Sequence, residues 1–324
     1  MKLNRPAWLV LWIASLSVIS AGATDVPIAA APAPATTVAS PAIAASAPQA
    51  ASKPVTGTVP GVPNAISPAS PCDEFVKRLP SVSRALCDDA KLKPTVGRSV
   101  NGRTIWARDI KPDNAKLRVL VIGAIHGDEP TSATLALQWL KLAQQAPSDT
   151  PQSVYWRFIP ALNPDGLFNK PAHRSNARGV DLNRNFATPN WERDARLYWE
   201  QRTRKDPRRY PGPKPLSEPE SRFLAAQMES FKPDLIVSIH APYGVLDFDG
   251  PSVPPSRLGR LYLDQVGIFP GSLGNFGGVH KGIPVVTIEL PSATRAPQDP
   301  ETRQMWLDLL RWMSERLAGG PSRS

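Results

Sequence analysis

A histidine and a glutamate three residues apart follow a strongly apolar run. In Val119-Leu-Val-Ile-Gly-Ala-Ile-His-Gly-Asp-Glu-Pro130, the aliphatic residues stop near Ala124, and His126 and Glu129 come next. A single His-x-x-Glu pair is weak evidence for a metal site, because a lone histidine can equally hydrogen-bond a backbone carbonyl. The pair becomes informative only together with the residues at the ends of the other apolar runs of the chain.

Three later apolar runs also end in polar or ionisable residues. They are followed by Asn163-Pro-Asp-Gly166 after the run ending near Pro160, by His240 after Leu235 to Ile239, and by Glu289 after Val285 to Ile288. Parallel strands of an α/β sheet present their carboxyl ends at one edge, where ligands bind. We therefore expect these side chains to lie close together.

His126, Glu129 and His240 supply two imidazoles and one carboxylate, the ligand set of a catalytic zinc site that keeps one position open. The sequence thus predicts one Zn²⁺ per chain. Glu289 stands between Ile288 and Leu290, where a carboxylate is costly to bury unless it has a partner or a task. A glutamate next to a metal-activated water can accept its proton and pass it to a leaving amine.

The elements around these residues alternate between strands and helices. The predicted strands are Arg103 to Ile110, Leu117 to Ala124, Val154 to Pro160, Leu235 to Ile239 and Val285 to Ile288; the predicted helices are one piece in 72–90, Thr131 to Ala146, one opening in Leu216 to Phe223, and Glu301 to Leu317. Alternation of this kind predicts an α/β domain with a mixed, largely parallel central sheet and helices on both faces. Ser217 and Glu220 fit a capping box, with Pro219 in the first turn. Asp299 is expected to cap the last helix, with Pro300 at its first position.

The N-terminal part has the composition of a targeting segment and a tether. Residues 1–23 have a positive start, an uncharged apolar stretch and Ala21-Gly22-Ala23, a cleavage site after Ala23. The alternative is an uncleaved membrane anchor. Residues 24–71, rich in Ala and Pro, are predicted to be a disordered linker. A secretory signal predicts a periplasmic or secreted protein, in which Cys72 and Cys87 can form a disulfide; two buried free thiols are the alternative.

The chain is basic, with a formal net charge of +10 over 324 residues. This charge predicts electrostatic attraction to an anionic surface such as a cell wall. No nucleic-acid motif is present, and export argues against nucleic acid as a partner. The densest basic run, Arg202 to Arg209, is interpreted as a solvated loop.

Five separated motifs together resemble the M14 class of zinc carboxypeptidases. In chain order they are His126-x-x-Glu129, Asn163-Pro-Asp-Gly166, Arg174-Ser-Asn-Ala-Arg-Gly-Val-Asp-Leu-Asn-Arg-Asn185, Ser238-Ile-His240 and Thr287-Ile-Glu289. Gly97 to Arg103 is similar to the start of that domain, so residues 95–324 are taken as the catalytic domain and 72–94 as a short N-terminal segment. Within the class, Ser217-Glu-Pro-Glu220 and Gly282 to Pro291 are most similar to the branch of murein peptide amidases.

The resemblance implies a role for each matching residue. His126, Glu129 and His240 would hold zinc, Glu289 would be the general base and then the acid, and Arg174 would stabilise the oxyanion. Asn183 and Arg184 would bind the terminal carboxylate of the substrate. Arg178 competes with Arg174, the alternative being an ordinary loop charge. Asp247 and Asp249 are interpreted as turn carboxylates, with contact to substrate ammonium groups as the alternative, and Tyr262 is expected in a helix without a catalytic role.

The implied reaction is cleavage of the bond between γ-D-glutamate and meso-diaminopimelate in murein peptides. The substrate could instead be other peptides with a free C-terminal carboxylate, or acyl-amino acids. A third possibility is a wall-binding protein that has lost catalysis. The intact set of His126, Glu129, His240 and Glu289 argues against it.

Overall fold

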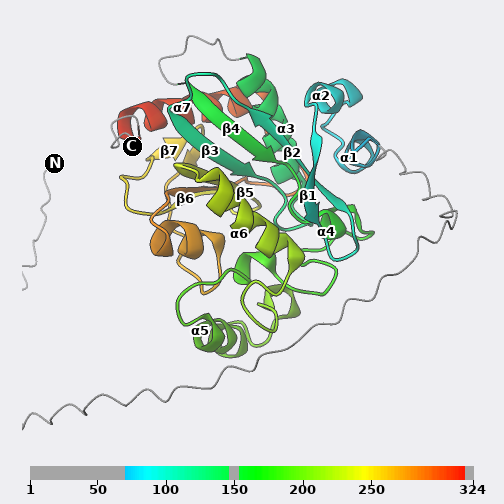
Figure 1. Cartoon of the computed structure of the whole chain (residues 1–324), viewed down its shortest axis with the longest axis vertical. Coiled ribbons are helices and arrows are strands. Elements are labelled where there is room, and N and C mark those ends of the chain that lie inside the picture. The colour runs from blue at the N-terminus through cyan, green and yellow to red at the C-terminus, as the bar shows by residue number, and fades with distance from the viewer. Residues whose placement is uncertain (1–69, 146–152, 318–324) are drawn as a thin grey trace, which may run out of the picture. The chain divides into compact units, whose positions relative to one another are not determined.

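The computed structural model describes residues 70–145 and 153–317 (Figure 1). All of them belong to Pro63–Ser324, the second of two compact units into which the chain divides. The predicted signal peptide and nearly all of the predicted linker lie outside the described residues and remain predictions. Among the helices that the structure describes, none is both long and apolar enough to cross a bilayer.

A seven-stranded sheet forms the centre of the fold. Its strands lie in the order β1 (Lys93–Arg98), β2 (Thr104–Ile110), β4 (Val154–Ile159), β3 (Leu117–Ile122), β5 (Leu235–His240), β9 (Val285–Glu289) and β6 (Val245–Asp249). The four central strands, β4, β3, β5 and β9, are parallel, and the remaining pairings are antiparallel. The predicted mixed sheet with a parallel centre is confirmed. A separate ribbon pairs β7 (Arg257–Leu258) with β8 (Leu261–Tyr262).

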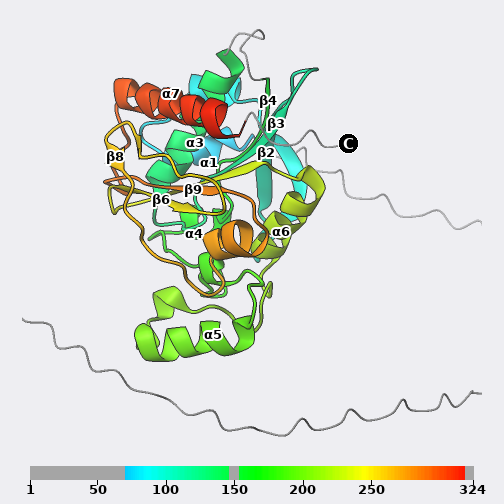
Figure 2. The same ribbon diagram turned by 90° about the vertical axis from the view of Figure 1, so that its left-hand side faces the viewer.

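Helices cover both faces of the sheet, as predicted (Figure 2). On one face, α3 (Pro130–Gln145) and α7 (Asp299–Arg316) pack on Val119, Val121 and other outward residues of the strands. On the other face, α6 (Pro219–Phe231) and η4 (Gly274–His280) pack on Leu120, Ile122 and their neighbours. Adjacent residues of β3 thus serve opposite cores, because successive side chains of a strand point to opposite faces. Burial on both faces explains the continuous aliphatic runs of the sequence.

Strands β1 and β6 are missing from the sequence prediction. β1 is an edge strand whose residues are mostly exposed, so it has no apolar run to mark it. β6 alternates Leu246 and Phe248 with Asp247 and Asp249, and the interpretation of the two carboxylates as part of a turn is wrong. The helix expected around Tyr262 is also wrong, since this residue lies in β8 and is 64% exposed.

The helix ends differ from the predicted caps. Helix α6 does begin with Pro219, but its N-cap is Glu218 and no side chain caps it, so the capping box is wrong. Instead, the side-chain amide of Asn185 donates a hydrogen bond to Oγ of Ser217. The side-chain amide of Asn176 donates to the carboxylate of Glu220. The last helix begins at Asp299 with Gln298 as N-cap, so Asp299 is not the cap and Pro300 is its second residue.

The segment between β4 and α6 consists of short elements joined by long loops. They are α4 (Pro164–Phe168), η1 (Leu182–Arg184), α5 (Trp191–Leu197), η2 (Tyr198–Arg202) and η3 (Pro207–Arg209). Asn163, the N-cap of α4, donates from its side chain to the carbonyls of Ile125 and Arg174. The motif that begins at Asn163 therefore fixes the loop after β3 against the loop that carries Arg174.

Two short helices, α1 (Cys72–Arg78) and α2 (Arg84–Asp89), replace the single helical piece predicted for 72–90. A disulfide joins Cys72 to Cys87, which confirms the predicted pairing. Both cysteines are buried in the same core as α3, and no residue of α1 or α2 lines the pocket that contains His126. The disulfide and the two helices that it joins therefore stabilise the fold and do not form part of the pocket wall.

Replacing both cysteines by serine is expected to lower the free energy of unfolding by about 3 kcal/mol, the value for a loop of this length in the chain-entropy model. Urea denaturation of the two proteins without reductant measures the difference. Wild-type protein in reductant is the control and should approach the variant. Equal midpoints for variant and oxidised wild type would contradict the bracing role.

Candidate metal centre and active site

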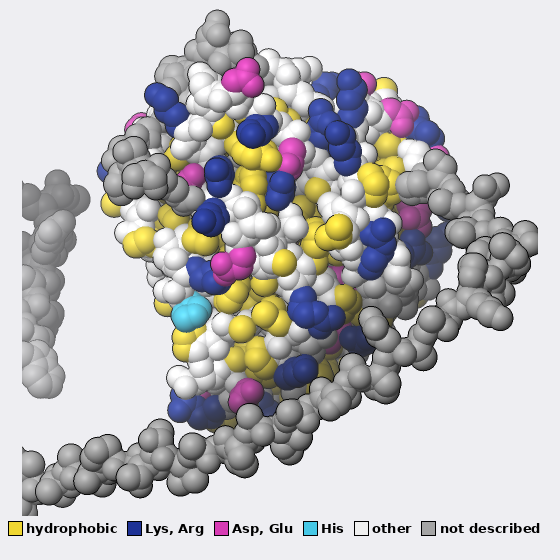
Figure 3. Space-filling model, in the orientation of Figure 1, with side chains coloured by type: hydrophobic (Ala, Val, Ile, Leu, Met, Phe, Trp, Pro, Cys, Tyr) yellow, Lys and Arg dark blue, Asp and Glu magenta, His cyan; other side chains and the backbone are white. Residues whose placement is uncertain are grey.

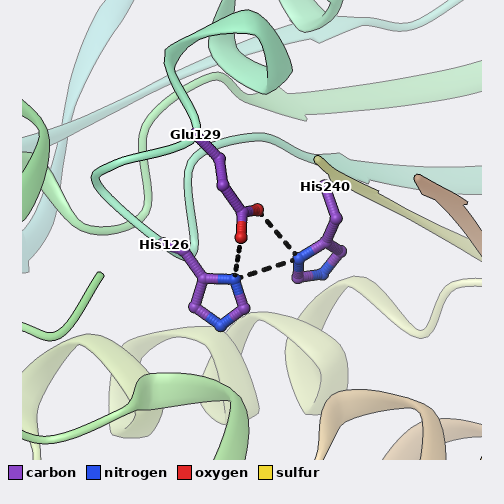
Figure 4. Close-up of side chains that lie close together, drawn as sticks. All are labelled: His126, Glu129 and His240. Carbon is purple, nitrogen blue, oxygen red and sulfur yellow. Dashed lines mark hydrogen bonds and ion pairs between the residues drawn. The ribbon is translucent and has the colours of Figure 1, made fainter. Parts of the chain in front are cut away.

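His126, Glu129 and His240 converge on one point at the carboxyl end of the sheet (Figure 4). The Nδ1 atom of His126 lies 2.8 Å from Oε1 of Glu129, and Nδ1 of His240 lies 3.2 Å from Oε2 of the same carboxylate. The two Nδ1 atoms are 3.2 Å apart. All three side chains are buried, and their ligand atoms lie within 4.8 Å of one another. The predicted ligand set is thus brought together.

The second ring nitrogen of each histidine has its own partner. Nε2 of His126 lies 3.2 Å from Oδ1 of Asp181, and Nε2 of His240 lies 2.9 Å from Oγ of Ser238. The carboxylate of Asp181 can only accept, so it favours the His126 tautomer with the proton on Nε2, which leaves the Nδ1 lone pair for a metal. The hydroxyl of Ser238 can accept a hydrogen bond from Nε2 of His240 and so is compatible with the same tautomer there. Outer partners of this kind orient histidine ligands in metal sites.

This donor set fits zinc. Two neutral imidazole nitrogens and one carboxylate are the protein ligands of catalytic zinc sites, in which a fourth position remains open. Two Nδ1 atoms that face each other inside the protein also need a shared cation, or a proton between them, to avoid opposed lone pairs. Glu129 can serve as an anionic metal ligand. Burial opposes its ionisation, but His126 and His240 hold its pKa below the ordinary value, so the carboxylate is ionised.

Glu289 is the last residue of β9 and lies beside the last residue of β5, His240, in the parallel register. It is 7% exposed, and its Oε2 has no hydrogen-bond partner among the described residues. Burial raises the pKa of this carboxyl above its ordinary value. An unpartnered carboxylate oxygen next to the metal ligands can accept a proton from a reacting water.

Asp181 connects the metal ligands to Arg174. Its Oδ2 accepts from Nε of Arg174 at 3.0 Å, while its Oδ1 lies near His126 and accepts from the backbone N–H of Asn183. The sequence places Asp181 within one of the five motifs but predicts no role for it. The residue is fully buried. Asp181 therefore orients both the metal ligand His126 and the guanidinium of Arg174.

Arg174 and Arg178, the two candidates for the oxyanion role, lie in different places. Arg174 lines the pocket beside the metal ligands, with Nη1 3.4 Å from Oε1 of Glu129. Arg178 does not line the pocket and lies 3.5 Å from the buried carboxylate of Glu218, with more than half of its side chain exposed. The geometry therefore favours Arg174 over Arg178 for contact with the oxyanion. Arg178 is an exposed loop residue that pairs with Glu218.

Asn183 and Arg184 also line the pocket. Oδ1 of Asn183 accepts from the backbone N–H of Leu273, so its amide N–H groups remain for a ligand. The guanidinium of Arg184 lies over the ring of Phe269, and its Nε has no partner among the described residues. Burial lowers the pKa of Arg184 to about 10, and the nearby Arg174 and Arg209 add to this effect. The negative charge of Asp181 opposes this shift, but the Asp181 carboxylate is already hydrogen-bonded to Arg174 and His126, so the guanidinium of Arg184 can still attract an anionic ligand.

The pocket has a volume of about 260 Å³ and contains all seven predicted site residues. Its wall also includes residues for which the sequence predicts no place in the site, Asp128, Arg208, Arg209 and Tyr243. Asp247 and Asp249, for which contact with the substrate was only the alternative interpretation, line it as well. The interpretation of the basic run 202–209 as a solvated loop is wrong for its end, because Arg208 bonds Asp128 and reaches the pocket with Arg209. That contact joins residues 80 positions apart, and no local pattern of the sequence signals it.

Comparison with known proteins agrees with this geometry. The family model described as zinc carboxypeptidase matches residues 85–247, which include His126, Glu129 and His240. Murein peptide amidase A of Vibrio campbellii is 32% identical over 181 residues, covering 54% of this chain and 69% of that protein. The enzyme of the same name from Escherichia coli K12 is 29% identical over 224 residues, covering 67% of this chain and 88% of that protein.

A solved structure shows the same fold. Carboxypeptidase A from Helicoverpa armigera aligns with a TM-score of 0.52 at 18% identity, over 74% of this chain and 69% of that one. With the family match and the buried set of two histidines and a glutamate, this chain belongs to the zinc carboxypeptidase family and is a zinc hydrolase.

Proposed function

We propose that this chain is an exported amidase that cleaves the bond between γ-D-glutamate and meso-diaminopimelate in murein peptides. The observation that carries the proposal is the pocket itself. It is lined by the metal ligands and Glu289 and also by Asn183 and Arg184, which would bind a free carboxylate of the substrate. The relatives named murein peptide amidase A support this choice of substrate.

Each site residue has a task in this reaction. His126, Glu129 and His240 would hold the zinc ion, which when bound activates water and polarises the scissile carbonyl. Glu289 takes the proton of the attacking water at its unpartnered oxygen and gives it to the leaving amine. Arg174 donates to the oxyanion of the tetrahedral intermediate. The fork of Arg184 and the amide of Asn183 bind the carboxylate next to the scissile bond.

A second candidate is a general carboxypeptidase or a deacylase of acyl-amino acids. Asn183 and Arg184 favour it equally, because they recognise a carboxylate and not the rest of the substrate. The murein peptide differs in carrying further carboxylates. The exposed guanidinium of Arg208 and the half-buried one of Arg209 at the pocket wall are suited to an additional anionic group, which favours the first candidate.

Export and association with the wall complete the proposal. The disulfide between buried cysteines is typical of oxidising compartments, which agrees with the signal peptide predicted for residues 1–23. Residues 24–71 would then be a linker between the export signal and the enzyme. Lys and Arg side chains are spread over the face shown in Figure 3 and do not gather in one patch. Such a surface suits weak electrostatic attraction to an anionic polymer.

Mass spectrometry of a digest tests the reaction. Zinc-loaded protein is expected to release free diaminopimelate from L-Ala-γ-D-Glu-meso-diaminopimelate, to stop on addition of a chelator, and to recover with added zinc. The matched control is the same tripeptide with the carboxylate next to the scissile bond converted to an amide, which Arg184 cannot bind as an anion. An intact tripeptide alongside hydrolysis of α-linked peptides would establish the second candidate instead.

A further inference from the structure

Unpaired polar atoms are concentrated in the active-site pocket. The described part of the chain contains five buried side-chain polar atoms without a hydrogen-bond partner. Three of them line this one pocket: Oδ1 of Asp128, Nε of Arg184 and Oε2 of Glu289. A buried polar atom without a partner is costly, so three around one cavity indicate groups that a ligand satisfies. The proposed reaction uses Arg184 and Glu289 but gives Asp128 no task.

The other oxygen of Asp128 is held by Arg208. Oδ2 of Asp128 accepts from Nη2 of Arg208 at 2.7 Å, which joins the loop after β3 to η3. The backbone of Arg208 is also fixed, because its N–H donates to Oδ1 of Asp206 at 2.9 Å. A guanidinium has five N–H donors, so this contact leaves others for a ligand. The two side chains therefore present a carboxylate oxygen and a guanidinium side by side at the pocket wall.

Asp128 adjoins the reacting centre rather than the site for the leaving residue. It stands between two metal ligands in the chain. Although burial opposes the charge of Arg174, nearby carboxylates raise its pKa, and Asp128 is one of them. Arg209 instead acts on Arg184, whose pKa burial lowers to about 10 with a contribution from Arg209. In the proposed reaction the leaving residue extends from the metal toward Arg184, so the acyl part of the substrate would extend toward Asp128.

A guanidinium beside a carboxylate oxygen is complementary to a carbon that carries both a carboxylate and an N–H group. Glutamate that is joined through its γ-carboxyl has such a carbon, because its α-carboxylate stays free and its α-nitrogen is an amide N–H. The carboxylate fits the planar fork of an arginine, and the N–H fits Oδ1 of Asp128. An α-linked peptide has no free carboxylate at this position, because that carboxyl forms the scissile bond. The pair therefore favours a γ-linked acyl residue.

We propose that Asp128 and Arg208 are specificity-determining residues that bind the two substituents of the glutamate α-carbon on the acyl side of the scissile bond. Arg208 binds the free α-carboxylate, and Oδ1 of Asp128 accepts from the amide N–H. This inference rests on the proposed γ-glutamyl substrate and gives the γ-linkage a recognition element of its own. A substrate without one of the substituents leaves one member of the pair unsatisfied, and sites of this kind reject such analogues strongly.

Three substrates with the same leaving residue, diaminopimelate, test the two contacts separately. The parent acyl group is N-acetyl-γ-D-glutamyl. Glutaryl keeps the carboxylate but lacks the α-nitrogen, whereas N-acetyl-γ-D-isoglutaminyl keeps the N–H and has a neutral amide in place of the carboxylate. The kcat/KM values are measured on zinc-loaded full-length wild type, Asp128→Asn and Arg208→Gln. Asp88→Asn is the matched control, because Asp88 also accepts from an arginine, Arg84, but lies in α2 outside the pocket.

Wild type is expected to prefer the parent over each analogue by roughly 10- to 100-fold, the range for a hydrogen bond to a charged group. Asp128→Asn should remove the preference over glutaryl, because an asparagine that gives its oxygen to Arg208 turns its NH₂ group toward the N–H of the substrate. Arg208→Gln should remove the preference over isoglutaminyl. Each variant should keep one zinc ion per chain, and Asp88→Asn should match wild type. This crossed pattern differs from structural damage, which lowers all three substrates equally.

Binding provides a readout that does not depend on turnover. In a Glu289→Gln background, titration calorimetry should show tighter binding of the parent than of the glutaryl compound, and the added Asp128→Asn change should abolish the difference.

Equal kcat/KM for the parent and glutaryl substrates in wild type would overturn the inference and leave the proposed function intact. Variants that lower all three substrates equally would overturn it as well. If wild type hydrolyses none of the three, the proposed function fails, and the calorimetry decides on the pair. A preference for the parent that is lost with Asp128→Asn upholds the binding site, and the absence of any preference refutes it.

Discussion

Glu289→Gln is expected to lower kcat/KM by roughly 10²- to 10⁴-fold, the usual contribution of a general acid–base group. Glutamine keeps the shape of the side chain but cannot accept the proton of the attacking water. It should also fit without strain, because Oε2 of Glu289 has no partner among the described residues. The zinc content should stay at one ion per chain, since His126, Glu129 and His240 are unchanged.

Two measurements check this prediction together, a hydrolysis rate and zinc by mass spectrometry of the purified protein. Glu315→Gln, an exposed glutamate of α7, is the matched control and should behave as wild type. The wild-type kcat/KM should fall on acidification with a midpoint above the ordinary value of 4.5, because burial raises the pKa of Glu289 and protonation removes the base. The residual rate of Glu289→Gln should lack this acid limb. A variant with normal rate and normal acid limb would show that another group is the base.

The metal ligands could be predicted from sequence because they depend on a simple geometric fact. Parallel strands bring their carboxyl ends together, so polar residues after several apolar runs must meet at one edge. His126 and His240, 114 positions apart in the chain, have their Nδ1 atoms 3.2 Å from each other. Glu289 could be found for the same reason, since a carboxylate in an aliphatic strand is expensive without a purpose.

The pocket wall was harder to predict because its residues come from loops and from the antiparallel edge of the sheet. Arg208 and Arg209 reach the site only because the loop after η2 folds back onto Asp128. For β6, a usable signal did exist. Leu246 and Phe248 alternate with two aspartates, the period of a half-buried strand, but the nearby Gly250 favoured a turn.

The start of helix α6 could not be predicted correctly for a different reason: a local sequence signal was present, but tertiary contacts override it. Ser217 and Glu220 have the spacing of a capping box, yet Asn185 and Asn176 bond these side chains from the loop that follows Arg174. Ser217 is 9% exposed and Glu220 is fully buried. Their hydrogen bonds therefore hold the loop that carries the substrate-binding residues, and helix α6 begins without a side-chain cap.

Asp181→Asn is expected to weaken zinc binding roughly 10- to 100-fold, the usual effect of losing an outer partner of a histidine ligand. Asp181 accepts from Arg174 with one oxygen and faces His126 and the N–H of Asn183 with the other. Arg174 and His126 hold the pKa of this carboxyl well below its ordinary value, although burial opposes its ionisation. An asparagine has only one accepting oxygen, so one of these donors must lose its bond.

The loss should extend to catalysis at saturating zinc, because Arg174 is the oxyanion donor in the proposed reaction and removal of such a donor costs roughly 10²- to 10³-fold in kcat. Competition with a chelator measures zinc affinity, and rates at several zinc concentrations separate the two effects. Asp165→Asn is the matched control: Asp165 is also buried and accepts two hydrogen bonds, from Ser99 and Asn101, outside the pocket. Both variants should be less stable, but only Asp181→Asn should bind zinc weakly. If the two variants kept the same zinc affinity and the same rate, Asp181 would be a structural residue and the orientation of His126 and Arg174 would have to come from elsewhere in the loop.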